Sequence, residues 1–271
     1  MRKKMFGIFG VLVLLAMIAV PAAAITNGEL DGEDHPNVGI MIADVNGEPE
    51  WRCSGTLIAP TVFLTAGHCV DGADATRVWF DTDLTGNLEY PYGGETSIEG
   101  IPIPHPDYDW GDSDPHDVGV VILAEVVTGI GFGVLPAEGL LDDLRKSVRP
   151  LWGELEKFTM VGYGQLAEWP PPVLTSELVR RVAESEYVAL TPTNLHLSQH
   201  LSENSRWDTS DGGTCFGDSG GPAYWIDDYG NEVLVAVTST GDAQCIATGL
   251  YYRVDTPGSL DWIKGFLDNS E

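Results

Sequence analysis

A serine lies beside an acid in the glycine-rich stretch TCFGDSGGP at residues 214–222. A serine hydroxyl is a weak nucleophile at neutral pH, so Ser219 needs a base that takes its proton. Histidine suits this task because its neutral imidazole accepts a proton near pH 7. His68 lies in LTAGHC, and Asp117 opens the apolar run DVGVVIL. The three side chains could therefore supply the nucleophile, the base and the orienting acid of acyl transfer.

Each of these residues has a simpler interpretation when it is taken alone. Asp117 could be a turn residue at the end of a strand, and a single histidine is more often structural. The occurrence of all three contexts in one chain favours catalysis. Acyl transfer also needs backbone N–H groups that stabilise the developing oxyanion. The N–H groups of Gly217 and Ser219 are the predicted donors.

The sequence GDSGG also satisfies the pattern G-x-S-x-G, which marks the nucleophile of lipases and esterases with the α/β-hydrolase fold. That fold places its histidine after the serine in the chain. No histidine follows Ser219, so the order of residues excludes this alternative.

The first 24 residues are typical of a secretory signal peptide. Three basic residues at positions 2–4 precede an apolar run over residues 5–20, and small residues at Ala22 and Ala24 suit signal peptidase. The mature protein is therefore expected to be secreted; the alternative is an uncleaved membrane anchor. No other stretch reaches the roughly 18 apolar residues of a membrane span. We expect no stable membrane association once the signal is removed.

The chain is strongly acidic, with a formal net charge of -27 that becomes -30 when residues 1–24 and their three basic side chains are removed. Such a surface excludes nucleic acid as a partner. It favours basic substrates by electrostatic steering, or a salty or acidic habitat.

Four cysteines in an exported chain favour two disulfides, but they allow three connectivities, between which the sequence alone does not choose. We expect Cys53 to pair with Cys69 and Cys215 with Cys245, because each bridge closes a short loop within one half of the chain. The cysteines are not clustered as zinc ligands are.

The mature sequence favours short strands separated by Gly, Pro, Asp and Asn, a pattern typical of barrels or sandwiches. Asn46-Gly47 is a hairpin signal. The end of the chain is helical, since Thr256 can cap a helix that Pro257 begins. Strands are predicted at 38–44, 51–58, 62–65, 78–80, 118–123, 158–164, 178–188, 234–238 and 249–254, and a helical turn at 140–146.

The segment HPDYDWGDSDPHD, residues 105–117, carries many oxygen and nitrogen ligands. Its acids lack the spacing of an EF-hand, and Gly111 falls where a ligand should be. A solvated loop beside the site is the favoured interpretation, and we predict neither a metal nor a cofactor.

The motifs LTAGHC, HDVGVVIL and GDSGGP occur in the order of the trypsin-like (chymotrypsin-fold) secreted serine proteases, which the sequence resembles over nearly all of residues 25–268. The resemblance implies an all-β fold of two six-stranded antiparallel β-barrels packed around a cleft, with a C-terminal helix. It places the first barrel at about 25–135, the second at about 150–256 and the helix at about 257–268, within one domain over 25–271.

The implied activity is that of a monomeric serine endopeptidase acting on protein or peptide substrates through an acyl-enzyme. The alternative is a binding module that kept the fold and lost catalysis. The resemblance also implies that a new N-terminus at Ile25, exposed by signal peptidase, pairs with Asp218 and shapes the oxyanion hole. This pair would explain the acid beside Ser219.

The resemblance assigns VTSTG, residues 237–241, to the substrate-binding segment. The trypsin branch has an aspartate at the floor of its specificity pocket, where this chain has Gly213, so strict Arg/Lys preference is not expected unless Asp211 or Asp242 supplies the charge. An open pocket for a large apolar or aromatic side chain is expected instead. Its predicted residues are Gly213, Thr214, Phe216, Ser239, Thr240, Gly241 and Gly249.

Overall fold

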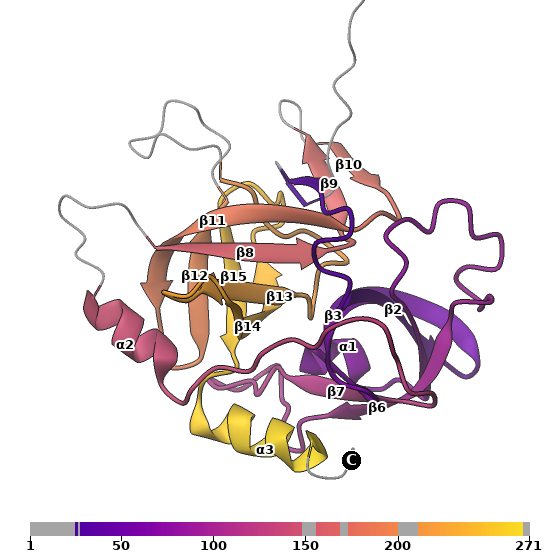
Figure 1. The fold of residues 1–271 in the computed structure, drawn as a ribbon, viewed down its shortest axis with the longest axis horizontal. Coiled ribbons are helices and arrows are strands. Elements are labelled where there is room, and N and C mark those ends of the chain that lie inside the picture. The colour runs from indigo at the N-terminus through magenta and orange to yellow at the C-terminus, as the bar shows by residue number, and fades with distance from the viewer. Residues whose placement is uncertain (1–24, 27, 148–155, 169–172, 200–210, 268–271) are drawn as a thin grey trace, which may run out of the picture.

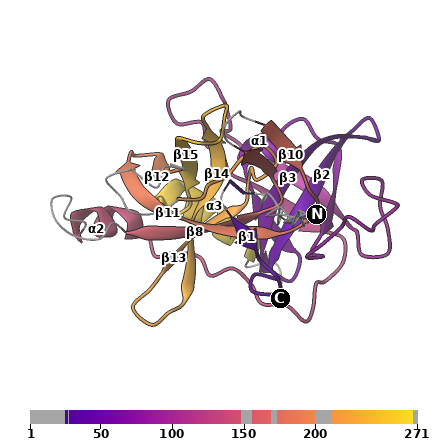
Figure 2. The same ribbon diagram turned by 90° about the horizontal axis from the view of Figure 1, so that it is seen from above.

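The computed structural model describes residues 25–26, 28–147, 156–168, 173–199 and 211–267. The predicted signal peptide, residues 1–24, lies outside this range. Two closed antiparallel barrels make up the chain and lie side by side (Figures 1 and 2). None of the described helices is long and apolar enough to cross a bilayer.

The first barrel closes in the order β2-β3-β4-β7-β6-β5. Its hairpin β2–β3 turns at Asn46 and Gly47, which both have positive φ as the Asn-Gly signal requires. Its strands are β2 (Val38–Val45), β3 (Glu48–Ala59), β4 (Val62–Thr65), β5 (Ala75–Trp79), β6 (Ile98–Pro104) and β7 (Gly119–Leu123), and the short helix α1 (Gly67–Val70) follows β4.

The second barrel closes because β8 pairs with both β13 and β11. The short strand β1 adds to its outer edge along β11, and β9 pairs with β10 beside it. Its strands are β8 (Lys157–Gly162), β11 (Arg181–Leu190), β12 (Asn194–Ser198), β13 (Pro222–Ile226), β14 (Glu232–Gly241) and β15 (Thr248–Arg253); the additional strands are β1 (Glu29–Leu30), β9 (Gln165–Glu168) and β10 (Val173–Ser176).

Strand β2 is buried along nearly its whole length because both of its faces are covered. Met41 and Ala43 point into the first barrel. Ile40 and Ile42 pack on the outside, against a cluster that includes Tyr163 of the second half. Because side chains alternate between the two faces of a strand, β2 contributes to two hydrophobic clusters.

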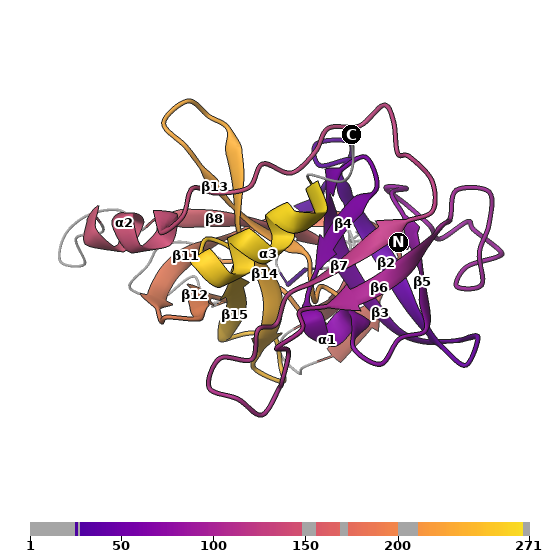
Figure 3. The ribbon, with the colours of Figure 1, turned by 90° about the horizontal axis from the view of Figure 1, so that it is seen from below.

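Two further helices complete the fold, α2 (Leu140–Ser147) and α3 (Pro257–Leu267). Thr256 caps α3, since its Oγ1 accepts from Ser259 N at 3.4 Å. Figure 3 shows α3 along the junction between the barrels. Leu260 and Ile263 join a core cluster with residues of both barrels, and Trp262 packs on His105 of the first half with ring centroids 5.0 Å apart.

Candidate active site

His68 has a rigid mount in the first barrel. It lies in α1 directly after β4, and its neighbour Cys69 is bonded to Cys53 of β3. The indole of Trp51 donates to the carbonyl of Cys69 at 2.8 Å. The imidazole is therefore held on a short segment that is fixed at both the backbone and the disulfide.

Asp117 holds the other side of that imidazole. Its carboxylate is fully buried and lies 3.0 Å from His68 Nδ1 through each oxygen. The His68 backbone N–H donates to it at 2.9 Å, and Ser239 Oγ donates at 2.6 Å. Burial alone would raise the pKa of Asp117, but these hydrogen bonds and the charge of His68 hold it below the usual range of an aspartate. A carboxylate that stays ionised can fix the tautomer of His68 and stabilise its protonated form.

Ser219 lies on the second barrel, in the tight turn that precedes β13. Its carbonyl accepts from Ser54 N of the first barrel at 2.8 Å, which ties the turn to the opposite half. The next residue must be glycine, because Gly220 has φ of +79° and an added Cβ would lie 2.0 Å from Thr65 Oγ1. His68 and Ser219 line the same cavity of about 450 Å³. No hydrogen bond joins these two described side chains, and such contacts often tighten only with substrate.

The predicted oxyanion donors belong to residues that line this cavity. Gly217 has φ of +99°, and an added Cβ would lie 2.8 Å from Arg52 Nε. Gly217 and Ser219 both line the cavity. Within the described part of the chain, neither backbone N–H donates to another group. Two N–H donors beside a serine are the arrangement that oxyanion stabilisation needs.

Asp218 points away from the cavity into the second half. It is fully buried and accepts from Gly164 N at 2.6 Å and Cys215 N at 2.9 Å. Burial raises its pKa to about 7, although these hydrogen bonds oppose the rise. Ile25 is also buried, and the following residue, Thr26, forms an antiparallel bridge with Gly213. The ion pair between Ile25 and Asp218 stays a prediction, because Ile25 follows Ala24 in this chain and carries no free ammonium.

The cavity has two walls beside the predicted nucleophile. The segments 214–217 and 238–242 form them, and the second disulfide joins Cys215 to Cys245 at one side. The structure brings the predicted residues Thr214, Phe216, Ser239, Thr240 and Gly241 to these walls.

Two of the residues expected in the open pocket lie elsewhere. Gly213 and Gly249 do not line the cavity. Gly213 instead packs on Gln199, since an added Cβ would lie 2.2 Å from Gln199 Cγ. Gly249 packs on two side chains, since an added Cβ would lie 2.7 Å from the Tyr251 hydroxyl and 2.8 Å from Gln199 Nε2. The space that the glycines leave is filled from within the protein.

Four residues of the site escaped the sequence analysis or gained a different role. Ser239 was expected in the pocket but also bonds Asp117. Trp110 belongs to the acidic loop 105–117 and packs edge-on against His68, with ring centroids 5.6 Å apart. Arg52 lies on β3 and Gln199 directly after β12, and only their position in space shows their relation to the site. The sequence could have indicated Trp110, because the loop that contains it was expected to lie beside the site.

One group of potential metal ligands lies at the site. The ligand atoms of Cys53, His68 and Cys69 lie within 4.8 Å of one another. Both sulfurs belong to a disulfide, whereas a metal needs thiolates. This group does not fit a metal.

The family model of trypsin matches residues 32–263. The chain belongs to the trypsin family of serine proteases. It is 29% identical to serine protease Hayan of Drosophila melanogaster, over 88% of this chain and 39% of that protein. It is 27% identical to serine protease 1 of the same organism, over 89% of this chain and 84% of that protein. It is 26% identical to chymotrypsin of Phaedon cochleariae, over 90% of this chain and 82% of that protein.

A solved structure of HL collagenase has the same fold. It superimposes with a TM-score of 0.65 at 21% identity, covering 90% of this chain and 99% of that one. The predicted pair of six-stranded antiparallel barrels is thereby confirmed.

Proposed function

We propose that the protein is a secreted serine endopeptidase that hydrolyses peptide bonds through an acyl-enzyme. One observation carries the proposal: a fully buried carboxylate, Asp117, holds the imidazole of His68 on the wall of the cavity that Ser219 also lines. A structural histidine would not need to face a nucleophile across an open cavity beside two N–H donors. Membership of the trypsin family supports the same reaction.

In the proposed reaction Ser219 attacks the substrate carbonyl while His68 takes the hydroxyl proton. The oxyanion accepts hydrogen bonds from the N–H groups of Gly217 and Ser219, and Asp117 stabilises the imidazolium. His68 then protonates the leaving amine. Water repeats the sequence on the acyl-enzyme, releases the second product as a carboxylic acid and restores Ser219.

We also propose that cleavage after Ala24 activates the protein. Asp218 is buried with two backbone donors and has a pKa of about 7, so it would gain from a cation nearby. The segment after Ile25 already lies beside Gly213 of the same half. A free ammonium at Ile25 would ionise Asp218 and hold the adjacent oxyanion donors. N-terminal sequencing of active protein that begins at a residue other than Ile25 contradicts this step.

Labelling with a serine-directed phosphonate tests the activity, with mass spectrometry to locate the label. We expect modification of Ser219 in the processed protein and none in the Ser219→Ala variant. Hydrolysis of a diverse peptide mixture should fail in the same variant. A folded, processed protein that takes no label and cleaves no peptide would be a binding module with the protease fold.

A further inference from the structure

We propose that Gln199 closes the deep end of the substrate pocket, so that the protease selects short side chains, such as those of Ala and Val, on the acyl side of the scissile bond. The inference rests on the proposed endopeptidase function and names its substrate class. It replaces the aromatic preference that the glycines of the sequence suggest.

Gln199 lies directly after β12 and has zero exposure. Three glycines surround its side chain, and each is a position from the predicted pocket. Built Cβ atoms would lie 2.2 Å from Gln199 at Gly213, 2.8 Å at Gly249 and 3.9 Å at Gly241. Gly241 lines the cavity, whereas Gly213, Gly249 and Gln199 itself lie behind its wall. The glycines therefore accommodate Gln199, and the substrate is left with the part of the pocket nearer to the surface.

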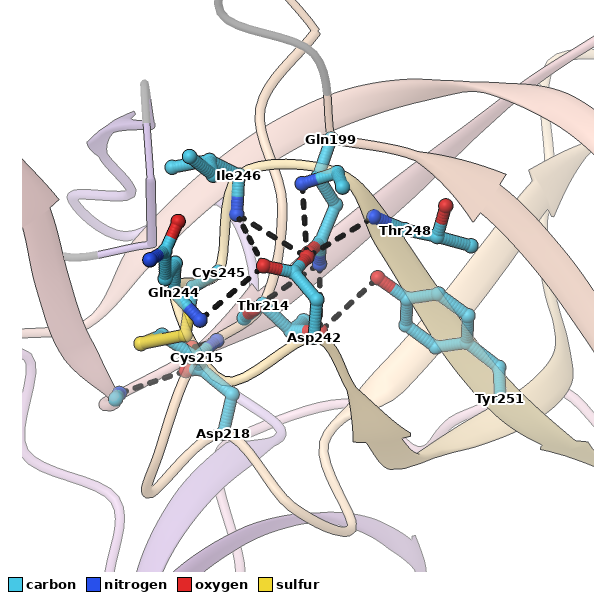
Figure 4. The surroundings of a disulfide bond; sticks show 12 residues. Gln199, Thr214, Cys215, Asp218, Asp242, Gln244, Cys245, Ile246, Thr248 and Tyr251 are labelled. Carbon is cyan, nitrogen blue, oxygen red and sulfur yellow. Dashed lines mark hydrogen bonds between the residues drawn. A yellow bond between two sulfur atoms is a disulfide. The ribbon is translucent and has the colours of Figure 1, made fainter. Parts of the chain in front are cut away.

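The side chain of Gln199 is anchored at one end. Nε2 donates to Thr214 O at 3.0 Å and contacts Thr214 Oγ1 at 3.3 Å. Because a carbonyl only accepts, the bond to Thr214 O fixes which end of the amide points to it. The backbone N of Gln199 also donates to Ala247 O at 2.9 Å. Figure 4 shows Gln199 pointing toward Thr214, with Tyr251 on the neighbouring strand.

The other end of the amide has no partner among the described groups. Gln199 Oε1 is buried, and none of the residues that the structure describes bonds it. A buried unpaired oxygen destabilises a fold, and an apolar side chain would fill a purely structural core better. This oxygen is the atom of Gln199 that faces the cavity wall, since a Cβ built on Gly241 would lie 3.9 Å from it.

The negative charge on the pocket walls is turned toward its own loop, where backbone N–H groups occupy its acceptor sites. Asp242 is the carboxylate among the cavity-lining residues. Burial raises its pKa, but the backbone N–H groups of its own loop hold the pKa below the usual range. Those donors, at residues 244 and 246–248, lie 2.8–3.2 Å from Asp242 Oδ1 or Oδ2. The carboxylate is committed to the loop, as Figure 4 also shows.

The test compares kcat/KM for peptides that differ only in the residue before the scissile bond, which is Ala, Val, Phe or Arg. The processed wild type should prefer Ala and Val to Phe and Arg. Gln199→Ala should raise the ratio of Phe to Ala by about tenfold or more, since a few methylene groups in a pocket discriminate by factors of this size. Gln244→Ala, an exposed glutamine of the neighbouring loop, is the matched control and should leave the ratio unchanged.

Gln199→Asn shortens the side chain and keeps the amide, so it should give an intermediate ratio and serves if Gln199→Ala does not fold. An unchanged ratio in folded variants, or a wild type that prefers Phe, overturns the inference while phosphonate labelling of Ser219 still supports the protease. A wild type that takes no label and cleaves none of the peptides overturns the proposed function, and this inference with it.

Discussion

Asp117 depends on Ser239 as well as on His68, because Ser239 Oγ donates to its second oxygen at 2.6 Å. Hydrogen bonds to charged groups contribute roughly 1.5–3 kcal/mol. We expect Ser239→Ala to lower kcat about tenfold with little change in KM, because the acid would be less firmly oriented. Steady-state kinetics of the processed protein measure both constants.

Ser239→Thr keeps the hydroxyl and should restore most of the rate. Ser113→Ala is a matched control, since Ser113 bonds only to its exposed neighbour Asp112 among the described groups. A tenfold rise in KM at constant kcat would mean that Ser239 acts on binding and not on the acid.

Sequence motifs predicted His68, Asp117 and Ser219 as a catalytic group because each lies in a distinctive local context, and their catalytic roles stay a prediction. Gln199 and Ser239 could not be assigned their contacts in this way. Gln199 meets Gly213 and Gly249 only after β12, β15 and the segment before Ser219 have come together. A glycine shows that space is needed, but not whether a substrate or the protein fills it.

His35 makes stability depend on pH. Burial would lower its pKa, but Asp31 and Glu232, which bond its two ring nitrogens, raise the pKa to about 9. A pKa above the unfolded value of 6.5 stabilises the fold fully below pH 6.5, and the stabilisation is lost as pH rises through 9. We expect a loss on the order of 3 kcal/mol in the free energy of unfolding between pH 6 and 9.5.

Urea unfolding at the two pH values measures this loss. His35→Gln should remove most of the pH dependence over this window, whereas His196→Gln should retain it, because burial lowers the pKa of His196. If the free energy of unfolding changes by the same amount between the two pH values in wild type and in His35→Gln, His35 is not the group responsible.

At the scale of elements, hydrophobic periodicity predicted the strands that carry apolar runs, and β4 coincides with its predicted range. It missed β6 (IEGIPIP) and β13 (PAYWI), because proline argues against a strand. Pro102 and Pro104 are nevertheless accommodated on β6 because barrel closure, a long-range effect, sets the pairing there. β12 was missed as well, since its neighbours come from distant parts of the sequence.

The two disulfides should have similar effects on stability and different effects on activity. They close loops of 16 and 30 residues, for which chain entropy predicts about 3 kcal/mol each. Replacing Cys215 and Cys245 by Ala should raise KM, because the bridge supports a pocket wall. Replacing Cys53 and Cys69 should lower kcat, because that bridge anchors His68. Guanidinium unfolding and steady-state kinetics test both pairs, and identical kinetic changes would contradict the distinction.

At the scale of the whole molecule, a fully buried ion pair between Arg180 and Asp31 fastens the junction of the barrels, with Nε and Oδ2 2.7 Å apart. The guanidinium also bonds to groups of the N-terminal segment, of the first barrel and its outgoing loop, and of the second half. These acceptors are Gly32 O, Val38 O, Phe80 O, Thr82 Oγ1 and the Tyr163 hydroxyl, at 2.9–3.2 Å.

Arg180→Met should lower the free energy of unfolding by about 3–5 kcal/mol, because the buried carboxylate of Asp31 loses one of its two cationic partners and keeps only His35. Adding Asp31→Asn should recover part of the loss. Arg145→Met, at an exposed pair with Asp142, should cost less than about 1 kcal/mol. Denaturant titration of the four proteins measures the differences, and a loss at Arg180 as small as that at Arg145 would refute the role of the junction.

Each terminal segment of the described chain packs on the half that is more distant from it in the sequence. Strand β1, which precedes the first barrel, is paired to β11 of the second, while α3, which follows the second barrel, packs by Trp262 on His105 of the first. The two halves therefore cannot separate unless β1 leaves β11 or α3 leaves the first half. Melting should accordingly occur in one step for both halves, and trimming either extremity should disorganise the cleft as a whole rather than the nearer barrel alone.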